Sequence, residues 1–190
     1  EQLGEIRLRY PDSVAVDLSD GSCWVGDWYD DEVIHVSAAG AVLWRSPLDE
    51  FYGPECVSVN QRDRSVWVAD WSNDQTVHLA ANGTELWRSA VGCGPLWLDV
   101  NPNDGSCWAA DWWNSRVVHF SASGTLLFAG TNFSGPASLA VNPNDGSVWI
   151  VDEELDELVH LSATGEEISR IGGFYFPASV SVNPNDGSVW

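Results

Sequence analysis

Residues 136–149 read PASLAVNPNDGSVW, and residues 177–190, 41 positions later, read PASVSVNPNDGSVW. The same spacing extends over most of the chain. Prolines recur at intervals of 43, 41, 41 and 41 residues, at Pro11, Pro54, Pro95, Pro136 and Pro177. Tryptophans keep the same intervals at Trp24, Trp67, Trp108, Trp149 and Trp190. Agreement between two independent residue types predicts an internal repeat of about 41 residues.

The repeat divides the sequence into complete and partial copies. The complete repeats are residues 11–53, 54–94, 95–135 and 136–176, and a partial repeat occupies residues 177–190. Residues 1–10 precede the first proline, and residues 5–9 are expected to form the last strand of a preceding repeat. We expect all of these to belong to one domain. The sequence has no methionine, which predicts a mature or trimmed product.

Each repeat has the pattern of four short strands. In the third repeat, apolar runs predict strands at residues 96–100, 107–111, 117–121 and 126–129, separated by turns such as Asn-Pro-Asn-Asp-Gly at 101–105. Successive apolar residues within a strand indicate that both faces of its sheet are covered. Four-stranded antiparallel sheets at this period predict an all-β protein, a β-propeller whose blades are the repeats. Helical repeats are excluded because no stretch has 3.6-residue spacing.

Several segments resemble the NHL-repeat family of β-propellers. VWVAD at residues 66–70 resembles the second strand of that family, and WWNSRVV at residues 112–118 resembles the segment that follows it. The resemblance implies a six-bladed ring, for which the natural chain would have to continue; a closed five-bladed ring is the alternative. NHL propellers include protein-binding, carbohydrate-binding and RNA-binding modules as well as lyase-like and lactonase-like relatives. The resemblance therefore implies a fold and no single activity.

The charge of the chain restricts its partners and its location. There are 28 acidic residues and 8 basic ones, all of them arginine, for a net charge of −20. This charge argues against binding nucleic acid or an anionic membrane surface, and no apolar run is long enough to insert into a bilayer. Together with the four cysteines, it predicts an extracellular or cell-envelope protein with disulfides. The cysteines are Cys23, Cys56, Cys93 and Cys107, and the sequence leaves their pairing open.

The loops provide the candidate binding surface. Loops from second to third strand, and those that link one repeat to the next, are expected to open on one face. They are rich in aromatic and acidic residues, and the predicted binding residues are Trp28, Tyr29, Trp71, Trp112, Trp113, Phe133 and Tyr175. Such a surface suits sugar rings, cationic groups or a protein partner. Trp28, Trp71 and Trp112 share one register, which equally fits packing over a neighbouring blade. We take the other four as unrepeated and therefore as better indicators of a specific surface.

Two further residue types recur once in each complete repeat. They are the histidines His35, His78, His119 and His160, and the aspartates Asp27, Asp70, Asp111 and Asp152. The histidines lie in the third strand, where a hydrogen-bonded structural role is favoured over metal binding. The aspartates end the second strand, where loop amides need an acceptor. A ring of carboxylates is also a calcium ligand set, although the prediction is that no metal or cofactor is bound.

Motifs for catalysis are missing from the sequence. It contains no GxSxG, HExxH, P-loop or dinucleotide-binding fingerprint, so we predict no catalytic residues and favour a non-enzymatic protein. The predicted function is an extracellular scaffold or protein-binding propeller, with self-assembly into a surface layer or filament as one form of it. The alternatives are a glycan-binding propeller lectin and a metal-dependent lyase-like or lactonase-like propeller.

Overall fold

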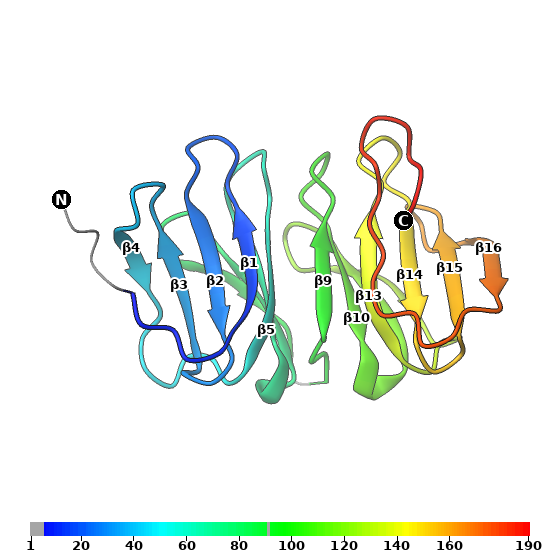
Figure 1. Cartoon of the computed structure of the whole chain (residues 1–190), viewed down its shortest axis with the longest axis horizontal. Coiled ribbons are helices and arrows are strands. Elements are labelled where there is room, and N and C mark those ends of the chain that lie inside the picture. Colours follow the sequence, from blue (N-terminus) through cyan, green and yellow to red (C-terminus); the bar gives the residue numbers. More distant parts are fainter. Residues whose placement is uncertain (1–5, 91) are drawn as a thin grey trace. The chain divides into compact units, whose positions relative to one another are not determined.

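The computed structural model describes residues 6–90 and 92–190 (Figure 1). The chain divides into two compact units, one that ends at Gly94 and one that comprises Pro95–Trp190, and each contains two four-stranded sheets. Helix is confined, among the described residues, to two single 3-10 turns, η1 (Trp71–Asn73) and η2 (Trp112–Asn114). No helix in this part of the chain is long and apolar enough to cross a membrane.

The sheets follow the predicted repeats in order. The first contains β1 (Pro11–Val16), β2 (Cys23–Asp27), β3 (Glu32–Val36) and β4 (Val42–Arg45). The second contains β5 (Pro54–Val59), β6 (Val66–Asp70), β7 (Gln75–Leu79) and β8 (Glu85–Arg88). The third contains β9 (Trp97–Val100), β10 (Cys107–Asp111), β11 (Arg116–Phe120) and β12 (Leu126–Gly130). The fourth contains β13 (Pro136–Val141), β14 (Val148–Asp152), β15 (Glu157–Leu161) and β16 (Glu167–Gly172).

The prediction of an all-β chain of four-stranded antiparallel sheets is confirmed. Strands adjacent in sequence are adjacent in each sheet, and all pair antiparallel. In the third repeat the ends of the predicted strands differ from those of β9 to β12 by no more than one residue. The short strands arise because apolar runs of four to six residues alternate with Asn-, Asp- and Gly-rich turns.

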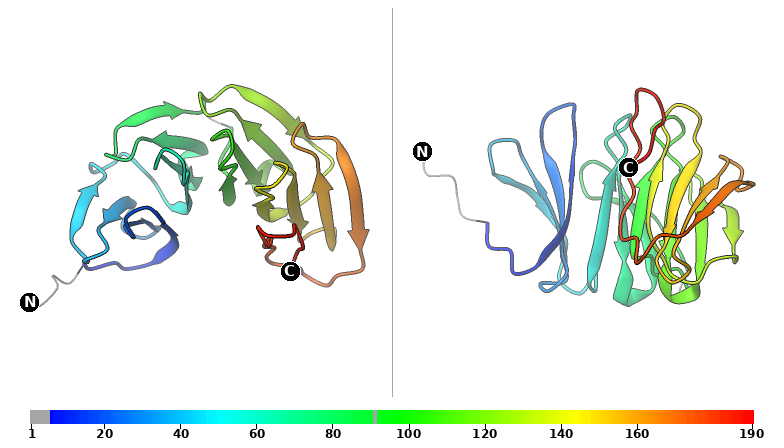
Figure 2. Two further views of the ribbon diagram at one scale, coloured as in Figure 1. Left: turned by 90° about the horizontal axis from the view of Figure 1, so that it is seen from above. Right: turned by 45° about the vertical axis from the view of Figure 1, so that its right-hand side comes forward.

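The two partial repeats form less structure than predicted. Residues 6–9 are irregular instead of forming the expected strand, and Glu5 lies outside the described residues. Backbone N–H groups of Arg9 and Tyr10 donate instead to the Asp27 carboxylate, at 2.8 and 3.0 Å. Residues 177–190 form only an isolated bridge between Val182 and Val189, beside the fourth sheet in the second unit (Figure 2).

Within each sheet the repeated tryptophan and histidine are cross-strand partners. Trp24 on β2 pairs with His35 on β3, and their rings are stacked with centroids 4.2 Å apart. The same pairing and stacking occur in the other three sheets, as Trp67–His78, Trp108–His119 and Trp149–His160. Residues opposite each other on neighbouring strands point to the same face, so one repeat register brings both rings together.

Adjacent sheets in a unit share an apolar core. In the first unit, Trp24 and Phe51 pack with valines of the second sheet, including Val57 and Val59. Trp44 on β4 lies against Gly83, where an added Cβ would overlap the indole ring. Gly83 also has a φ of +84°, which favours glycine. The close approach of ring and turn therefore fixes how these two sheets meet.

The predicted disulfides are not supported. The structure forms no disulfide bond among the residues it describes. The Cys107 thiol lies 3.5 Å from the Trp108 carbonyl oxygen, and the Cys56 thiol lies 3.9 Å from that of Val57. Both cysteines are buried within sheets. Their burial is explained by packing, since a buried cysteine behaves as a small apolar side chain.

Candidate functional site

Loops between second and third strands and the links between sheets meet at one end of each unit, as expected. In the first unit the Ser72 N–H donates to the Tyr52 carbonyl oxygen at 3.0 Å. In the second unit the Glu153 N–H donates to the Gly135 carbonyl oxygen at 2.9 Å. We call these surfaces the loop face, formed by residues 28–31, 46–53 and 71–74 in the first unit and by 112–115, 131–135, 153–156 and 173–176 in the second.

A repeated side-chain hydrogen bond fixes these loops. The last residue of each second-to-third-strand loop has a left-handed backbone, with φ between +50° and +57°; these residues are Asp31, Asp74, Ser115 and Asp156. The three aspartates each accept a 2.8 Å hydrogen bond from a link N–H, those of Gly53, Gly94 and Phe176 respectively. The Ser115 hydroxyl donates to the Ser134 carbonyl oxygen. This role was not predicted from the sequence, although all four residues lie four positions after a repeated aspartate.

The repeated aspartates Asp27, Asp70, Asp111 and Asp152 are fully buried and bind backbone and side-chain donors of the loops. Asp152, for example, accepts hydrogen bonds from the N–H groups of Ser134 and Gly135 at 2.8 and 2.9 Å. Asp111 pairs with the Arg116 guanidinium at 2.8 Å. In the described parts of the chain, no three His, Cys, Asp or Glu side chains gather as a metal site.

The repeated histidines lie inside the sheets and do not reach the loop face. His35 Nε2 is 2.9 Å from the Ser22 hydroxyl, and His119 Nε2 is 2.8 Å from that of Ser106. Nε2 of His160 is buried and has no hydrogen-bond partner among the described residues. Burial lowers the pKa of His119 to about 4, so its imidazole is neutral near pH 7.

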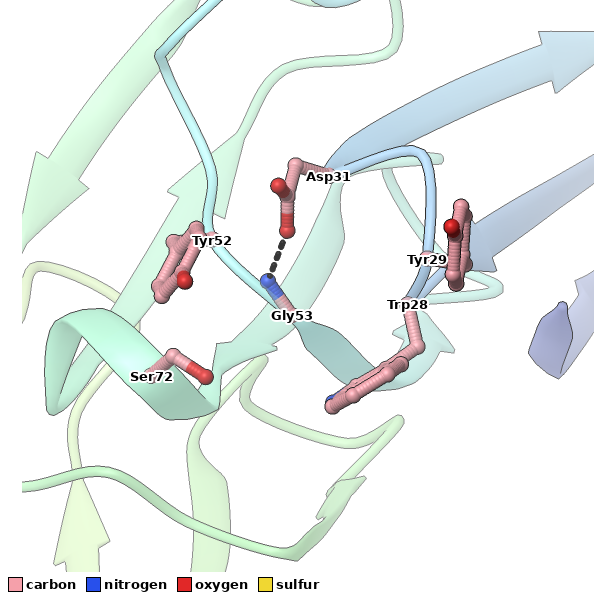
Figure 3. A pocket seen from close by; sticks show the side chains of 6 residues that line it. All are labelled: Trp28, Tyr29, Asp31, Tyr52, Gly53 and Ser72. Carbon is pink, nitrogen blue, oxygen red and sulfur yellow. Dashed lines mark hydrogen bonds between the residues drawn. The ribbon is translucent and has the colours of Figure 1, made fainter.

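A small pocket opens on the loop face of the first unit (Figure 3). Its volume is about 180 Å³, and it is lined by Trp28, Tyr29, Asp31, Tyr52, Gly53 and Ser72. Tyr29 and Tyr52 lie on opposite sides of the hydrogen bond between Asp31 and Gly53. The Trp28 indole packs so closely over Gly53 that an added Cβ would lie 2.9 Å from its nitrogen. The pocket therefore combines three aromatic rings with one carboxylate.

A guanidinium group of the chain itself contacts the edge of this surface. The Arg9 guanidinium lies over the Tyr29 ring, 5.3 Å from its centroid. Its Nε is also 3.3 Å from an Asp30 carboxylate oxygen. Tyr29 and its neighbour thus hold a cation by ring and charge together.

Structural comparison places the chain among known architectures, where sequence comparison finds nothing: no protein-family model and no curated protein matches it. It is similar to virginiamycin B lyase from Staphylococcus aureus, with a TM-score of 0.80 and 13% identity over 95% of this chain and 62% of that one. It is also similar to Kuenenia stuttgartiensis hydrazine synthase, with a TM-score of 0.81 and 15% identity over 97% and 55%. It is similar as well to a chain of a nidogen/laminin complex, with a TM-score of 0.74 and 17% identity over 91% of this chain and 68% of that one. The fold is a β-propeller.

These likenesses establish the propeller fold alone, because proteins with different activities share it. The chain spans about 55–62% of the length of the first two of these chains. The predicted propeller fold is confirmed, whereas assignment to the NHL group within it stays a prediction.

The remaining predicted loop-face residues of the propeller differ in exposure. Trp113 and Tyr175 are exposed, at 65% and 85%. Trp71 and Trp112 are half-buried. The Trp112 nitrogen would lie 2.8 Å from a Cβ on Gly135, the same packing over a link that Trp28 makes. The repeated tryptophans of the loop face are therefore partly exposed, and Trp28 and Trp112 also pack against the link to the next blade.

The prediction for Phe133 needs correction, because this ring is only 8% exposed and belongs to the core of the second unit. The Arg170 guanidinium lies over the Phe133 ring, 5.7 Å from its centroid. Phe51 is buried in the same way in the first unit, under Arg88 at 5.5 Å. Phe51 and Phe133 both lie three positions before a repeat proline, so the register identifies Phe133 as a repeated residue. It does not show burial by itself, because Phe174 shares this position and is exposed. Tyr52, which the prediction left out, lines the pocket instead.

Proposed function

We propose that this propeller is a non-enzymatic, extracellular protein-binding module, of the NHL type, that recognises its partner with the loop face. The observation that carries this proposal is the exposed aromatic pocket of Trp28, Tyr29 and Tyr52. Tyrosine and tryptophan dominate binding energy at protein interfaces. A group of such rings on the surface marks an interaction site, since exposed apolar patches otherwise promote aggregation.

The rigidity of the loop face supports the same role. Asp31 connects its loop to the following link through Gly53, and Asp27 holds the segment that leads into β1. Loops fixed in this way lose little conformational entropy when a partner binds. The net charge of −20 favours partners that carry positive charge and speeds their encounter.

The comparisons are compatible with this role. One similar propeller comes from a nidogen/laminin complex, which is an assembly of proteins. Self-association of the chain, in a surface layer or filament, is the form of this proposal in which the partner is a second copy. The lyase-like and lactonase-like alternative is supported by the fold alone.

Site-specific photo-crosslinking tests the proposal. A photoreactive phenylalanine replaces Tyr29 on the loop face, and the control protein carries it at Leu86, an exposed residue of the outer strand β8. Each protein is irradiated with the extracellular fraction of its source organism, and adducts are identified by mass spectrometry. We expect one defined protein adduct from position 29 and none from position 86. No adduct at position 29, or the same adducts at both positions, would overturn the proposal.

Glycan binding is the second candidate function, and it is favoured by the exposed ring of Trp113. This ring makes an edge-to-face contact with Trp112, with ring centroids 4.9 Å apart. Sugar rings stack on exposed indoles of this kind. A glycan array separates the two functions: selective binding to one sugar series that is lost in Trp113→Ala favours a lectin. Absence of binding to any glycan removes this candidate.

A further inference from the structure

Three arginines of this chain lie over aromatic rings, at distances of 5.3 to 5.7 Å from the ring centroids. The pairs are Arg9 with Tyr29, Arg88 with Phe51 and Arg170 with Phe133. Each guanidinium also contacts a carboxylate: Asp30 at 3.3 Å, Glu85 at 2.9 Å and Glu167 at 3.0 Å, respectively. The chain therefore holds guanidinium groups repeatedly by one arrangement, an aromatic face together with a carboxylate.

This arrangement follows from the chemistry of arginine. The guanidinium is flat, so it stacks on a ring, and its N–H groups remain free at the edge to donate to carboxylate oxygens. The negative face of the ring attracts the positive charge. A site that offers rings and a carboxylate on one wall is therefore complementary to arginine.

The pocket on the loop face offers the same components. Trp28, Tyr29 and Tyr52 supply rings and Asp31 supplies a carboxylate (Figure 3). No lining residue is cationic; the Arg9 guanidinium, which is not part of the lining, lies over the Tyr29 ring, so Trp28 and Tyr52 are the rings without such a cation in the described contacts. Asp31 accepts the Gly53 N–H through Oδ1, and its other oxygen can accept a second donor. The volume of about 180 Å³ lies below the roughly 300–1,000 Å³ of pockets for whole small molecules. It suits the head group of one side chain.

We propose that this pocket receives an arginine side chain from a basic segment of the partner protein. The inference rests on the proposed function and names the chemistry of the partner. Arginine is favoured over lysine because a flat guanidinium stacks on a ring while its edge N–H groups donate to a carboxylate, which a compact ammonium group cannot do in the same way. The net charge of −20 gives a basic segment a favourable approach.

Peptide titration tests the arginine assignment directly. Calorimetry measures binding of the 190-residue chain to three peptides of one glycine–serine sequence that carry arginine, lysine or citrulline at the central positions. Citrulline has nearly the shape of arginine without its charge. We expect the arginine peptide to bind at least about tenfold more tightly than the citrulline peptide and more tightly than the lysine peptide, with weaker binding at high salt. No binding of the arginine peptide, or binding of the lysine or the citrulline peptide as tight as that of the arginine peptide, overturns the assignment.

Matched substitutions locate the site. Asp31→Asn removes the charge but keeps a side-chain oxygen that can accept the hydrogen bond from the Gly53 N–H. Asparagine also tolerates the left-handed φ of +54° at this position. The control is Asp63→Asn, which removes the same charge from an exposed turn between β5 and β6, outside the loop face, and keeps an oxygen for the Ser65 N–H. We expect Asp31→Asn to weaken arginine-peptide binding roughly fivefold or more, and Asp63→Asn to leave it unchanged. Equal effects of both would indicate general charge attraction and overturn the site.

Tyr29→Leu supplies a second, independent variant. It retains an apolar side chain of moderate size but removes the ring, so binding of the arginine peptide is expected to fall at unchanged melting temperature. The crosslinking experiment separates the two proposals. A specific adduct at position 29 together with failed peptide tests leaves the protein-binding function standing without the arginine site, whereas no adduct removes the function itself.

Discussion

Trp24 and His35 lie directly opposite each other on β2 and β3, with their rings 4.2 Å apart and inclined by only 7°. Both side chains are buried, and the histidine is in contact with the Ser22 hydroxyl. Burial lowers the pKa of His35, because a protonated imidazole would lose its hydration there. The equivalent imidazole in the third sheet, His119, has its pKa lowered to about 4.

Acid is therefore expected to destabilise the fold through His119. The pKa of His119 is about 6.5 in the unfolded chain and about 4 in the folded chain. Between these pH values the unfolded chain therefore binds more protons than the folded chain. The contribution of the neutral histidine to the free energy of unfolding is complete above pH 6.5 and is lost as the pH falls toward 4. In His119→Gln, the melting temperature should fall less steeply between pH 7 and 4.5 than in the natural sequence. Parallel melting curves for the two proteins would show that the histidine is not responsible.

The repeated tryptophans should differ in their contribution to stability according to burial. Trp108 is fully buried, whereas Trp190, at the same repeat register, is 83% exposed. Trp108→Ala is expected to lower the free energy of unfolding by about 3–5 kcal/mol, measured by denaturant titration. Trp190→Ala should change it by less than about 0.5 kcal/mol. Similar losses in both variants would contradict this assignment of the core.

The repeat register predicted the sheets because the tryptophan, histidine and aspartate of each complete repeat have the same role in all four sheets. Trp67, His78 and Asp70 recur at fixed positions, and fixed positions in a repeat become fixed positions in a sheet. The same register identifies Phe133 as a repeated residue with Phe51, but it does not show burial, because Phe174 lies at the same position and is exposed. Regarding Phe133 as unrepeated was the error, since its partner appears two repeats earlier.

The pocket could not be predicted in the same detail. Tyr29 and Tyr52 come from a loop and a link in different repeats, and their approach depends on the hydrogen bond between Asp31 and Gly53. That bond requires a left-handed backbone at Asp31, which sequence spacing does not specify. Likewise, an even number of cysteines gave no information on whether their thiols meet. Local register was sufficient for the blades, whereas the site depends on contacts between blades.

Gly83 should be sensitive to substitution because of Trp44. Gly83→Ala adds a Cβ that overlaps the indole, in addition to the strain of a side chain at φ +84°. Gly173→Ala is the matched control, with φ +96° and no atom within 4 Å of the added carbon. Backbone strain alone is expected to cost about 1–2 kcal/mol, and the overlap about 1–3 kcal/mol more. Equal free energies of unfolding for the two variants would show that the indole does not pack on this turn.

Glu55 should make the first unit less stable at alkaline pH. It follows Pro54 at the start of β5, and burial, with a smaller contribution from Asp12, raises its pKa to about 7 from an ordinary value of 4.5. Between these values the folded chain binds more protons than the unfolded chain, so the free energy of unfolding falls as the pH rises. The destabilisation is complete above pH 7 and absent below pH 4.5.

Glu55→Gln removes this charge while keeping the shape of the side chain. At pH 8 the variant should be more stable than the natural sequence by about 1 kcal/mol, after allowance for partial solvent screening, and at pH 4 the two should be alike. Glu166→Gln, at an exposed position, is the control for a change in net charge and should show no such pH dependence. Denaturant midpoints at both pH values measure the difference. A stabilisation that is equal at pH 4 and pH 8 would attribute the effect to packing instead of charge, because only an ionised Glu55 is unfavourable in the folded chain.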